Sequence, residues 1–216
     1  MNVVGPPNPM QQDLFDSLRA AYHRLLNIPH GATPLSDEEK LALINLFRME
    51  TLPRGEFFVR AGEHAPNLAF LLNGLVRYYA LRSDGDDISL DFVEEYGIVG
   101  DYESLLLDRP ASQYVQALEP CQLLIVRYAD LLTAYEQHPR LERLGREFMS
   151  QYLAGVLRRL TDYMRQTPEE RYRHLLTERP SLLQRVPQLL LASYVGVTPV
   201  SLSRIRARMA RSERGS

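Results

Sequence analysis

The C-terminal end of the chain gathers the residue types best suited to bind a polyanion. Between Thr198 and Ser216 there are five arginines and one acid, Glu213, although the formal net charge of the 216-residue chain is −2. Guanidinium groups pair with phosphates and grip guanine edges, and serine and threonine hydroxyls contact either group. This local positive charge on an acidic chain indicates a polyanionic partner, with an ordinary solvated tail as the alternative.

The segment just before these arginines has the residue types that a helix-turn-helix requires. Ala192 is small enough for a second helix to cross the first closely. Gly196 permits the positive φ of a tight turn. Thr198 can cap the second helix, and Pro199 suits its first position. The alternative is an ordinary helical hairpin with solvated arginines, but these residues in register with the basic end favour double-stranded DNA as the partner.

Two short helices are therefore expected, over 187–194 and about 199–211. Val197, Leu202 and Ile205 would face the first of them. The side chains left to face outwards or towards a DNA groove are assigned to DNA binding: Thr198, Pro199, Val200, Ser201, Ser203, Arg204, Arg206 and Arg208.

A long helix is expected upstream, from about Pro139 to Gln166. Its apolar residues step by four and three, as in a coiled-coil seam: Met149, Leu153, Val156, Leu160 and Tyr163. Such a helix would be about 40 Å long at 1.5 Å per residue. Part of it must pack on the chain's own domain, but a seam of this length favours pairing with a second copy of the same helix in a homodimer.

The middle of the chain changes in texture after Pro53. Short apolar runs are separated by glycine and aspartate turns, a pattern typical of an antiparallel sandwich or barrel. Strands are expected over 57–59, 68–72, 75–81, 88–93, 114–117 and 121–126. Before them, helices are expected over 13–26 and from Ser36, whose spacing from Glu39 is that of a capping box.

Cysteine and histidine usage argues against metal or disulfide chemistry. Cys121 is the only cysteine, so it can form neither an internal disulfide nor a cysteine metal cage. The five histidines are scattered, with no pair at metal-ligand spacing. No stretch approaches the roughly 20 apolar residues that span a bilayer, and residues 1–10 lack the pattern of a signal peptide. We expect a cytoplasmic protein with no metal, no cofactor and no membrane partner.

An enzyme is the competing class of protein. Asp101, Glu103 and Asp108 form an acidic group beside a glycine turn, and paired carboxylates can perform acid–base work. Turn capping and solvated loop charge explain this group more simply. No nucleophile–base pair and no phosphate-binding loop is evident, so no enzymatic activity is expected.

Taken in order along nearly the whole chain, these motifs resemble the Crp/Fnr family of transcription regulators. Residues 52–56 and 61–63 resemble the opening strands of the family's cyclic-nucleotide-binding-like domain, and residues 73–77 with 84–85 resemble its next hairpin. Recognition helices of the family commonly carry a Ser-Arg pair where Ser203 and Arg204 stand.

The resemblance implies an α+β chain in three parts. These are an antiparallel, jelly-roll-like β-roll sensor domain with N-terminal helices (13–136), a dimerisation helix (137–166) and an all-α helix-turn-helix domain (167–216). The implied function is that of a homodimeric transcription regulator that binds a near-palindromic operator. RNA polymerase and a small-molecule effector are further candidate partners. The alternative is a cyclic-nucleotide or other small-molecule binding module whose vestigial helix-turn-helix makes protein contacts.

The implied effector pocket departs from the pattern of cyclic-AMP-binding members. Those members place a Gly-Glu pair on the ribose and an Arg-Ser pair on the cyclic phosphate, where this chain has Gly100-Asp101 and Ala111-Ser112. Asp101 could reach a hydroxyl with its shorter arm, but Ala111 cannot replace an arginine. The lost charge-assisted pair would cost on the order of a few kcal/mol. We therefore expect a degenerate pocket that does not respond to cyclic AMP.

Two other sensing chemistries of the family, and one of its DNA contacts, are also not expected. A lone Cys121 excludes an iron–sulfur centre, and a lone histidine such as His64 or His138 is more often a surface residue than a haem ligand. Many relatives carry a β-hairpin wing after the recognition helix, but this sequence stops about five residues beyond the expected helix. The phosphate contacts of a wing would then fall to the helices and to Arg206, Arg208 and Arg211.

Overall fold

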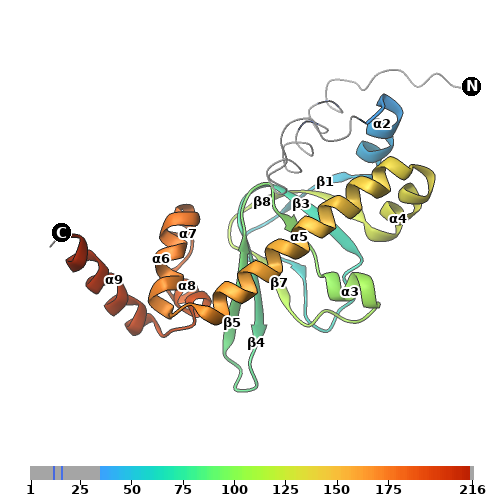
Figure 1. Ribbon diagram of the computed structural model, residues 1–216. Helices are drawn as coiled ribbons and strands as arrows, with labels where there is room; N and C mark the ends of the chain where they lie inside the picture. The colour runs from blue at the N-terminus through green and yellow to red at the C-terminus, as the bar shows by residue number, and fades with distance from the viewer. Residues whose placement is uncertain (1–11, 13–15, 17–34, 215–216) are drawn as a thin grey trace, which may run out of the picture. The chain divides into compact units, whose positions relative to one another are not determined.

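The computed structural model describes residues 12, 16 and 35–214 (Figure 1). They fall into two compact units, the first made of Met1–Tyr78 with Phe92–Gly155 and the second of Tyr79–Asp91 with Val156–Ser216. The helix expected over 13–26 lies outside the described residues apart from Asp16. No helix of the described part has both the length and the apolar character needed to cross a bilayer.

Two four-stranded sheets make up the β part, with strand orders β1-β8-β3-β6 and β2-β7-β4-β5. The pairings of β8 with β1 and β3, of β3 with β6 and of β2 with β7 are antiparallel. This arrangement confirms the expected β-roll and an α+β chain. The strands are β1 (Arg48–Leu52), β2 (Phe57–Val59), β3 (Asn67–Asn73), β4 (Val76–Leu81), β5 (Asp87–Val93), β6 (Ile98–Val99), β7 (Tyr114–Ala117) and β8 (Cys121–Arg127).

An apolar core lies between the two sheets of the first unit. Leu71 and Leu123 from one sheet and Val76 and Val115 from the other are fully buried in one cluster. Successive side chains of a strand point to opposite faces. The neighbouring positions Leu68 and Val126 therefore belong to a second cluster, which residues of the adjoining helices complete.

In the described part of the chain the helices before the second unit are α2 (Asp37–Leu46), α3 (Tyr102–Leu107), α4 (Tyr128–Gln137) and α5 (Pro139–Arg165), which ends within that unit. The expected capping box of α2 is present. The Glu39 amide donates to Ser36 Oγ at 3.2 Å, and the Ser36 amide donates to Glu39 Oε2 at 2.7 Å. The 27-residue α5 matches the long helix expected over 139–166 and runs unbroken from the first unit into the second.

The second unit contains α6 (Pro168–Glu178), α7 (Pro180–Arg185), α8 (Gln188–Val195) and α9 (Pro199–Arg214). Its apolar residues form a buried core to which all four helices contribute, with Leu175, Leu182, Leu191 and Leu202 among them. Pro180 begins α7 two residues after α6 ends, because proline is well tolerated in the first turn of a helix. These contacts give α8 and α9 a rigid support.

The part of β5 that ends at Asp91 belongs to the same unit and contacts these helices. The Ser89 amide donates to Ser193 Oγ at 2.9 Å, and Arg179 Nη1 lies 3.0 Å from Asp91 Oδ1. Burial, followed by the nearby Asp91 charge, raises the pKa of Tyr194. Strand β5 is thus held to α8 by a hydrogen bond from a backbone amide to a serine hydroxyl and to the end of α6 by an ion pair.

Candidate nucleic-acid interface

The turn between α8 and α9 has the geometry that the sequence predicts. Gly196 adopts φ 82° and ψ 36°, the left-handed region that favours glycine. The Val197 amide donates to the Ala192 carbonyl at 2.9 Å and closes the turn. A Cβ at Gly196 would also lie 2.9 Å from Tyr163 Oη. Both backbone conformation and close packing therefore require glycine here.

Thr198 and Pro199 start α9 as expected. Thr198 Oγ1 accepts a hydrogen bond from the Ser201 amide at 3.2 Å and donates one to Ser201 Oγ at 3.0 Å. These bonds occupy part of the hydrogen-bonding capacity of both hydroxyls. Thr198 and Ser201 thus have a capping role in addition to any contact with a phosphate.

The buried positions of α9 determine which of its side chains point outward. Leu202 and Ile205 are buried against the core of the unit. An α-helix turns about 100° per residue, so the opposite face carries Val200, Ser203 and Arg204, all of them exposed. An apolar side chain, a hydroxyl and a guanidinium side by side can contact a thymine methyl, a phosphate and a guanine edge.

Two arginines of α9 have no partner in the described part of the chain. Arg204 and Arg206 are exposed, and neither has a hydrogen bond or an ion pair to another described residue. Arg204 lies on the outward face and Arg206 on one flank of the helix. Both guanidinium groups are therefore available to an external anion.

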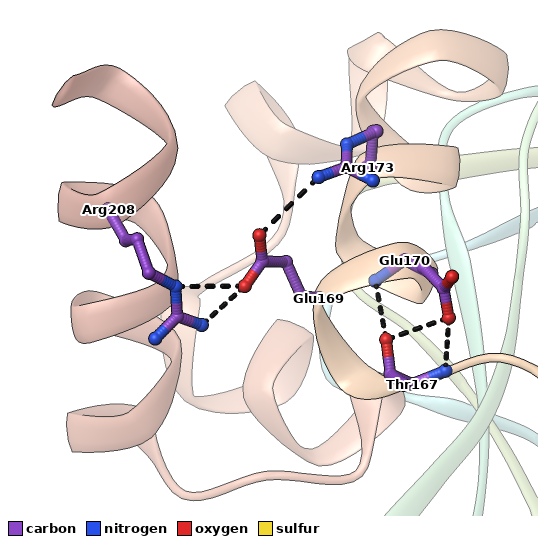
Figure 2. A network of polar contacts seen from close by, with 5 residues as sticks. All are labelled: Thr167, Glu169, Glu170, Arg173 and Arg208. Carbon is purple, nitrogen blue, oxygen red and sulfur yellow. Dashed lines mark hydrogen bonds and ion pairs between the residues drawn. The ribbon is translucent and has the colours of Figure 1, made fainter. Parts of the chain in front are cut away.

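Arg208 is placed differently from the other arginines assigned to DNA binding. Its Nε donates to Glu169 Oε2 at 2.9 Å, and its Nη2 contacts the same oxygen (Figure 2). The other carboxylate oxygen of Glu169, Oε1, lies 3.4 Å from Arg173 Nη2. Glu169 and Arg208 are 39 residues apart in the sequence. No local sequence pattern predicts this pair.

The start of α6 has a complete capping box, which Figure 2 also shows. The Thr167 amide donates to Glu170 Oε2 at 2.8 Å, and the Glu170 amide donates to Thr167 Oγ1 at 3.3 Å. The backbone hydrogen bond from Thr167 lowers the pKa of Glu170. Glu170 therefore caps its own helix, whereas its neighbour Glu169 faces α9.

Tyr163, expected in the dimer seam, also contacts α6. The guanidinium carbon of Arg171 lies 4.2 Å from the centroid of the Tyr163 ring, and Arg171 Nη1 donates to the Tyr163 carbonyl at 3.0 Å. The same ring neighbours Gly196. Tyr163 thus joins the end of α5 to the turn of the helix-turn-helix.

The other seam residues of α5 differ in exposure. Leu153 and Leu160 are each 54% exposed, whereas Met149 and Val156 are half-buried. Leu157 and Met164, which the seam did not include, are also exposed. These exposed residues lie within about 60° of one another around the helix. We call them the apolar stripe of α5: Leu153, Leu157, Leu160 and Met164.

Asp101, assigned to the effector pocket, is fully buried and caps α3. Its Oδ1 accepts from the Ser104 amide at 2.8 Å, and its Oδ2 accepts from Gln113 Nε2 at 3.0 Å. Gly100 beside it packs so closely that a Cβ would lie 2.6 Å from Leu68 Cδ2. Packing and helix capping account for both residues without a ligand.

Ala111 and Ser112 are engaged in a similar way. Ala111 is 3% exposed, its amide donates to the Glu63 carbonyl at 2.9 Å, and its carbonyl accepts from the Gly62 amide at 2.8 Å. Ser112 Oγ donates to Glu103 Oε2 at 3.0 Å. Ala111 thus places an apolar side chain where binding of a cyclic phosphate would require a cation. The neighbouring Ser112 is hydrogen-bonded to the Glu103 carboxylate.

Tyr102 of α3 and Tyr135 of α4 carry phenol groups whose pKa is shifted by burial. Burial raises the pKa of Tyr102 far above its ordinary value and raises the pKa of Tyr135 to about 12. Both phenols are therefore neutral at physiological pH.

Among the described residues, no cluster of three or more histidine, cysteine or acidic side chains could hold a metal ion.

The chain is similar to known proteins in sequence over one domain and in fold over most of its length. Residues 49–138 match the family model of the cyclic nucleotide-binding domain. No curated protein matches the sequence. A cyclic nucleotide-binding domain from Methylobacillus flagellatus is 18% identical, with a TM-score of 0.60, over 69% of this chain and 82% of its own.

Two further solved structures share the fold over most of the chain. The c-di-GMP-responsive global regulator CLP of Xanthomonas campestris is 17% identical, with a TM-score of 0.65, over 82% of this chain and 93% of its own. FixK2 of Bradyrhizobium japonicum is 19% identical, with a TM-score of 0.62, over 77% of this chain and 86% of its own. Residues 49–138 thus match the model of the cyclic nucleotide-binding domain, and the chain shares its fold with CLP and FixK2.

Proposed function

We propose that this chain is a cytoplasmic, homodimeric transcription regulator that binds a near-palindromic DNA site through α9 and does not respond to cyclic AMP. The observation that carries the proposal is the outward face of α9. Val200, Ser203 and Arg204 are exposed there, on a helix whose opposite face is buried. A helix of this kind fits the major groove, where an arginine can bind guanine through two hydrogen bonds.

The apolar stripe of α5 supports the homodimer. Four large apolar side chains exposed along one helix face favour burial against a second copy. In this proposal residues 13–136 form the sensor domain, residues 137–166 dimerise and residues 167–216 bind DNA. Two recognition helices would then lie about 34 Å apart, one turn of DNA.

The engaged pocket residues support the lack of a cyclic AMP response. Both oxygens of Asp101 accept hydrogen bonds from the protein, and Ala111 offers no positive charge to a phosphate. The Glu103 carboxylate on Ser112 would repel a cyclic phosphate. CLP is described as responsive to c-di-GMP, so a different small-molecule effector is compatible with this fold.

The test is a selection from random duplex DNA with the purified full chain at near-physiological salt. We expect enrichment of a short inverted repeat. On that site, Arg204→Ala should weaken binding by about 1–3 kcal/mol, or roughly 5- to 150-fold, and relax the preference at one base position. Arg206→Ala is the matched control, because it removes another exposed arginine, from the flank, and should weaken all sequences alike.

Two results would overturn the proposal. Full affinity and unchanged base preference in Arg204→Ala would remove the assigned role of that residue. Failure of the wild-type chain to enrich any sequence, with or without a metabolite extract, would favour a small-molecule binding module whose helix-turn-helix contacts proteins.

A further inference from the structure

We infer that Glu169 neutralises Arg208 and so limits the number of positive charges that α9 presents to the DNA backbone. This inference rests on the proposed function of α9. It concerns an acid outside the helix-turn-helix that acts through an arginine within it. Glu169 is thus a positioning residue for the interface.

The contacts around Glu169 leave neither of its oxygens without a cation. Oε2 receives both Nε and Nη2 of Arg208, and Oε1 faces Arg173 Nη2 (Figure 2). The Arg208 side chain is 60% exposed and that of Glu169 is 31% exposed. The pair is therefore at the surface, within reach of a bound anion, and its combined charge is zero.

The position of Arg208 on α9 agrees with this role. At about 100° per residue, Arg208 lies about 40° around the helix from Arg204 and about a quarter turn from the centre of the outward face. It lies on the flank that contacts α6, since its guanidinium meets a side chain of that helix. If a DNA phosphate bound Arg208, the Glu169 carboxylate would keep only Arg173 as a cationic partner and would lie close to that phosphate. The two negative groups would then repel each other.

The salt dependence of DNA binding measures this effect directly. Each phosphate neutralised by a lysine or arginine contributes about 0.9 to the slope of log K against log salt concentration. Arg208 paired with Glu169 should contribute nothing to that slope. Replacing the carboxylate by the isosteric amide in Glu169→Gln should free the guanidinium of Arg208 on α9, tighten binding and steepen the slope by about 0.9 per protomer.

The experiment compares the wild-type chain with Glu169→Gln, Arg208→Ala and their combination, using the anisotropy of a labelled duplex at several salt concentrations. Glu178→Gln is the matched control, because it removes an exposed acid of α6 that has no contact with α9. We expect the steeper slope only in Glu169→Gln and its loss in the double variant. Arg208→Ala alone should leave the wild-type slope unchanged.

Three outcomes would overturn the inference. Arg208→Ala could flatten the wild-type slope by about 0.9 per protomer, which would place Arg208 on a phosphate already. Glu169→Gln could match Glu178→Gln, which would reduce its effect to net charge. The effect could also persist without Arg208.

Failure of the proposed function is distinguished by a second readout, elution from immobilised heparin, a sulfated polyanion that needs no base recognition. If the wild-type chain binds no duplex, the proposed function fails, but the elution still tests the inference. Glu169→Gln should elute at higher salt than Glu178→Gln, and the double variant should not. Equal elution of Glu169→Gln and Glu178→Gln would contradict the pairing of Glu169 with Arg208 as a determinant of anion binding.

Discussion

Replacing Leu153 and Leu160 by aspartate should convert the proposed dimer into monomers. Each leucine is 54% exposed in the single chain. Fully burying a leucine contributes about 1.5–3 kcal/mol, so covering the exposed half contributes about 0.8–1.6 kcal/mol. Four such side chains per dimer contribute about 3–6 kcal/mol, and their loss should raise the dimer dissociation constant by roughly 10²- to 10⁴-fold.

Sedimentation equilibrium from nanomolar to micromolar concentrations measures this constant. Gln151→Asp with Arg158→Gln is a matched control, since it makes the same change of net charge on exposed positions of the opposite face of α5. We expect the control to remain dimeric and both proteins to keep the helical circular dichroism of the wild type. An unchanged dissociation constant in the leucine variant would refute the stripe as the dimer interface.

Three further predictions concern stability and ligand binding. Gly196→Ala should lower the free energy of unfolding by more than about 1 kcal/mol in urea titrations, because it strains a left-handed φ and brings Cβ towards Tyr163. Gly85→Ala, at φ +91° but with open space around it, isolates the backbone part. Hydrogen bonds from Thr167 lower the pKa of Glu170 in the folded state. The contribution of Glu170 to the free energy of unfolding should therefore be complete above the ordinary glutamate pKa of about 4.3 and be lost as pH falls through the folded-state pKa. Thr167→Ala should weaken this pH dependence, which urea titrations at several pH values measure. Ala111→Arg should destabilise the chain by about 1–3 kcal/mol, because the larger side chain overpacks a buried position. Calorimetry should detect no binding of cyclic AMP to this variant. Micromolar binding would show that the missing arginine alone prevents the wild-type chain from binding cyclic AMP.

Features set by neighbours in the sequence could be predicted well. The α8–α9 turn depends on Gly196 and Thr198, which act within a few residues of their own position. The same holds for the capping box of Ser36. The boundaries of α5 followed from its apolar spacing, because that spacing reports one helix face directly.

The missed elements are short or have weak local signals. The edge strand β1 is largely exposed, so its residues lack the alternation that identifies a half-buried strand. The two-residue β6 exists because Ala69 and Phe70 of β3 pair with it. Helix α9 also continues to Arg214, beyond the end expected near Arg211. The last turn of a helix makes few contacts, so the sequence pattern gives little information on the residue at which the helix ends.

The hydrogen-bond and ion-pair partners of the site residues are distant from them in the sequence. Alignment with ligand-binding relatives left open whether Asp101 could reach a hydroxyl. The structure shows that Ser104 and Gln113 use both of its oxygens. Likewise, the basic character of α9 suggested Arg208 as a DNA contact, whereas Glu169 pairs with it from another helix. Residue type predicted the kind of interaction, and tertiary packing selected the partner.

The charge distribution of α9 has a consequence for the role of the dimer. If Arg208 is neutralised, one protomer offers DNA mainly the two unpaired guanidinium groups of Arg204 and Arg206, so a single half-site is held weakly. Linking two protomers makes the second half-site contact intramolecular, which can raise affinity by 10²- to 10⁴-fold without new contacts. The monomeric Leu153→Asp, Leu160→Asp variant should therefore bind a half-site with about half the salt slope of the dimer. A monomer with the full slope would mean that other cations of the same chain contact the DNA, and that dimerisation serves to space the half-sites more than to supply affinity.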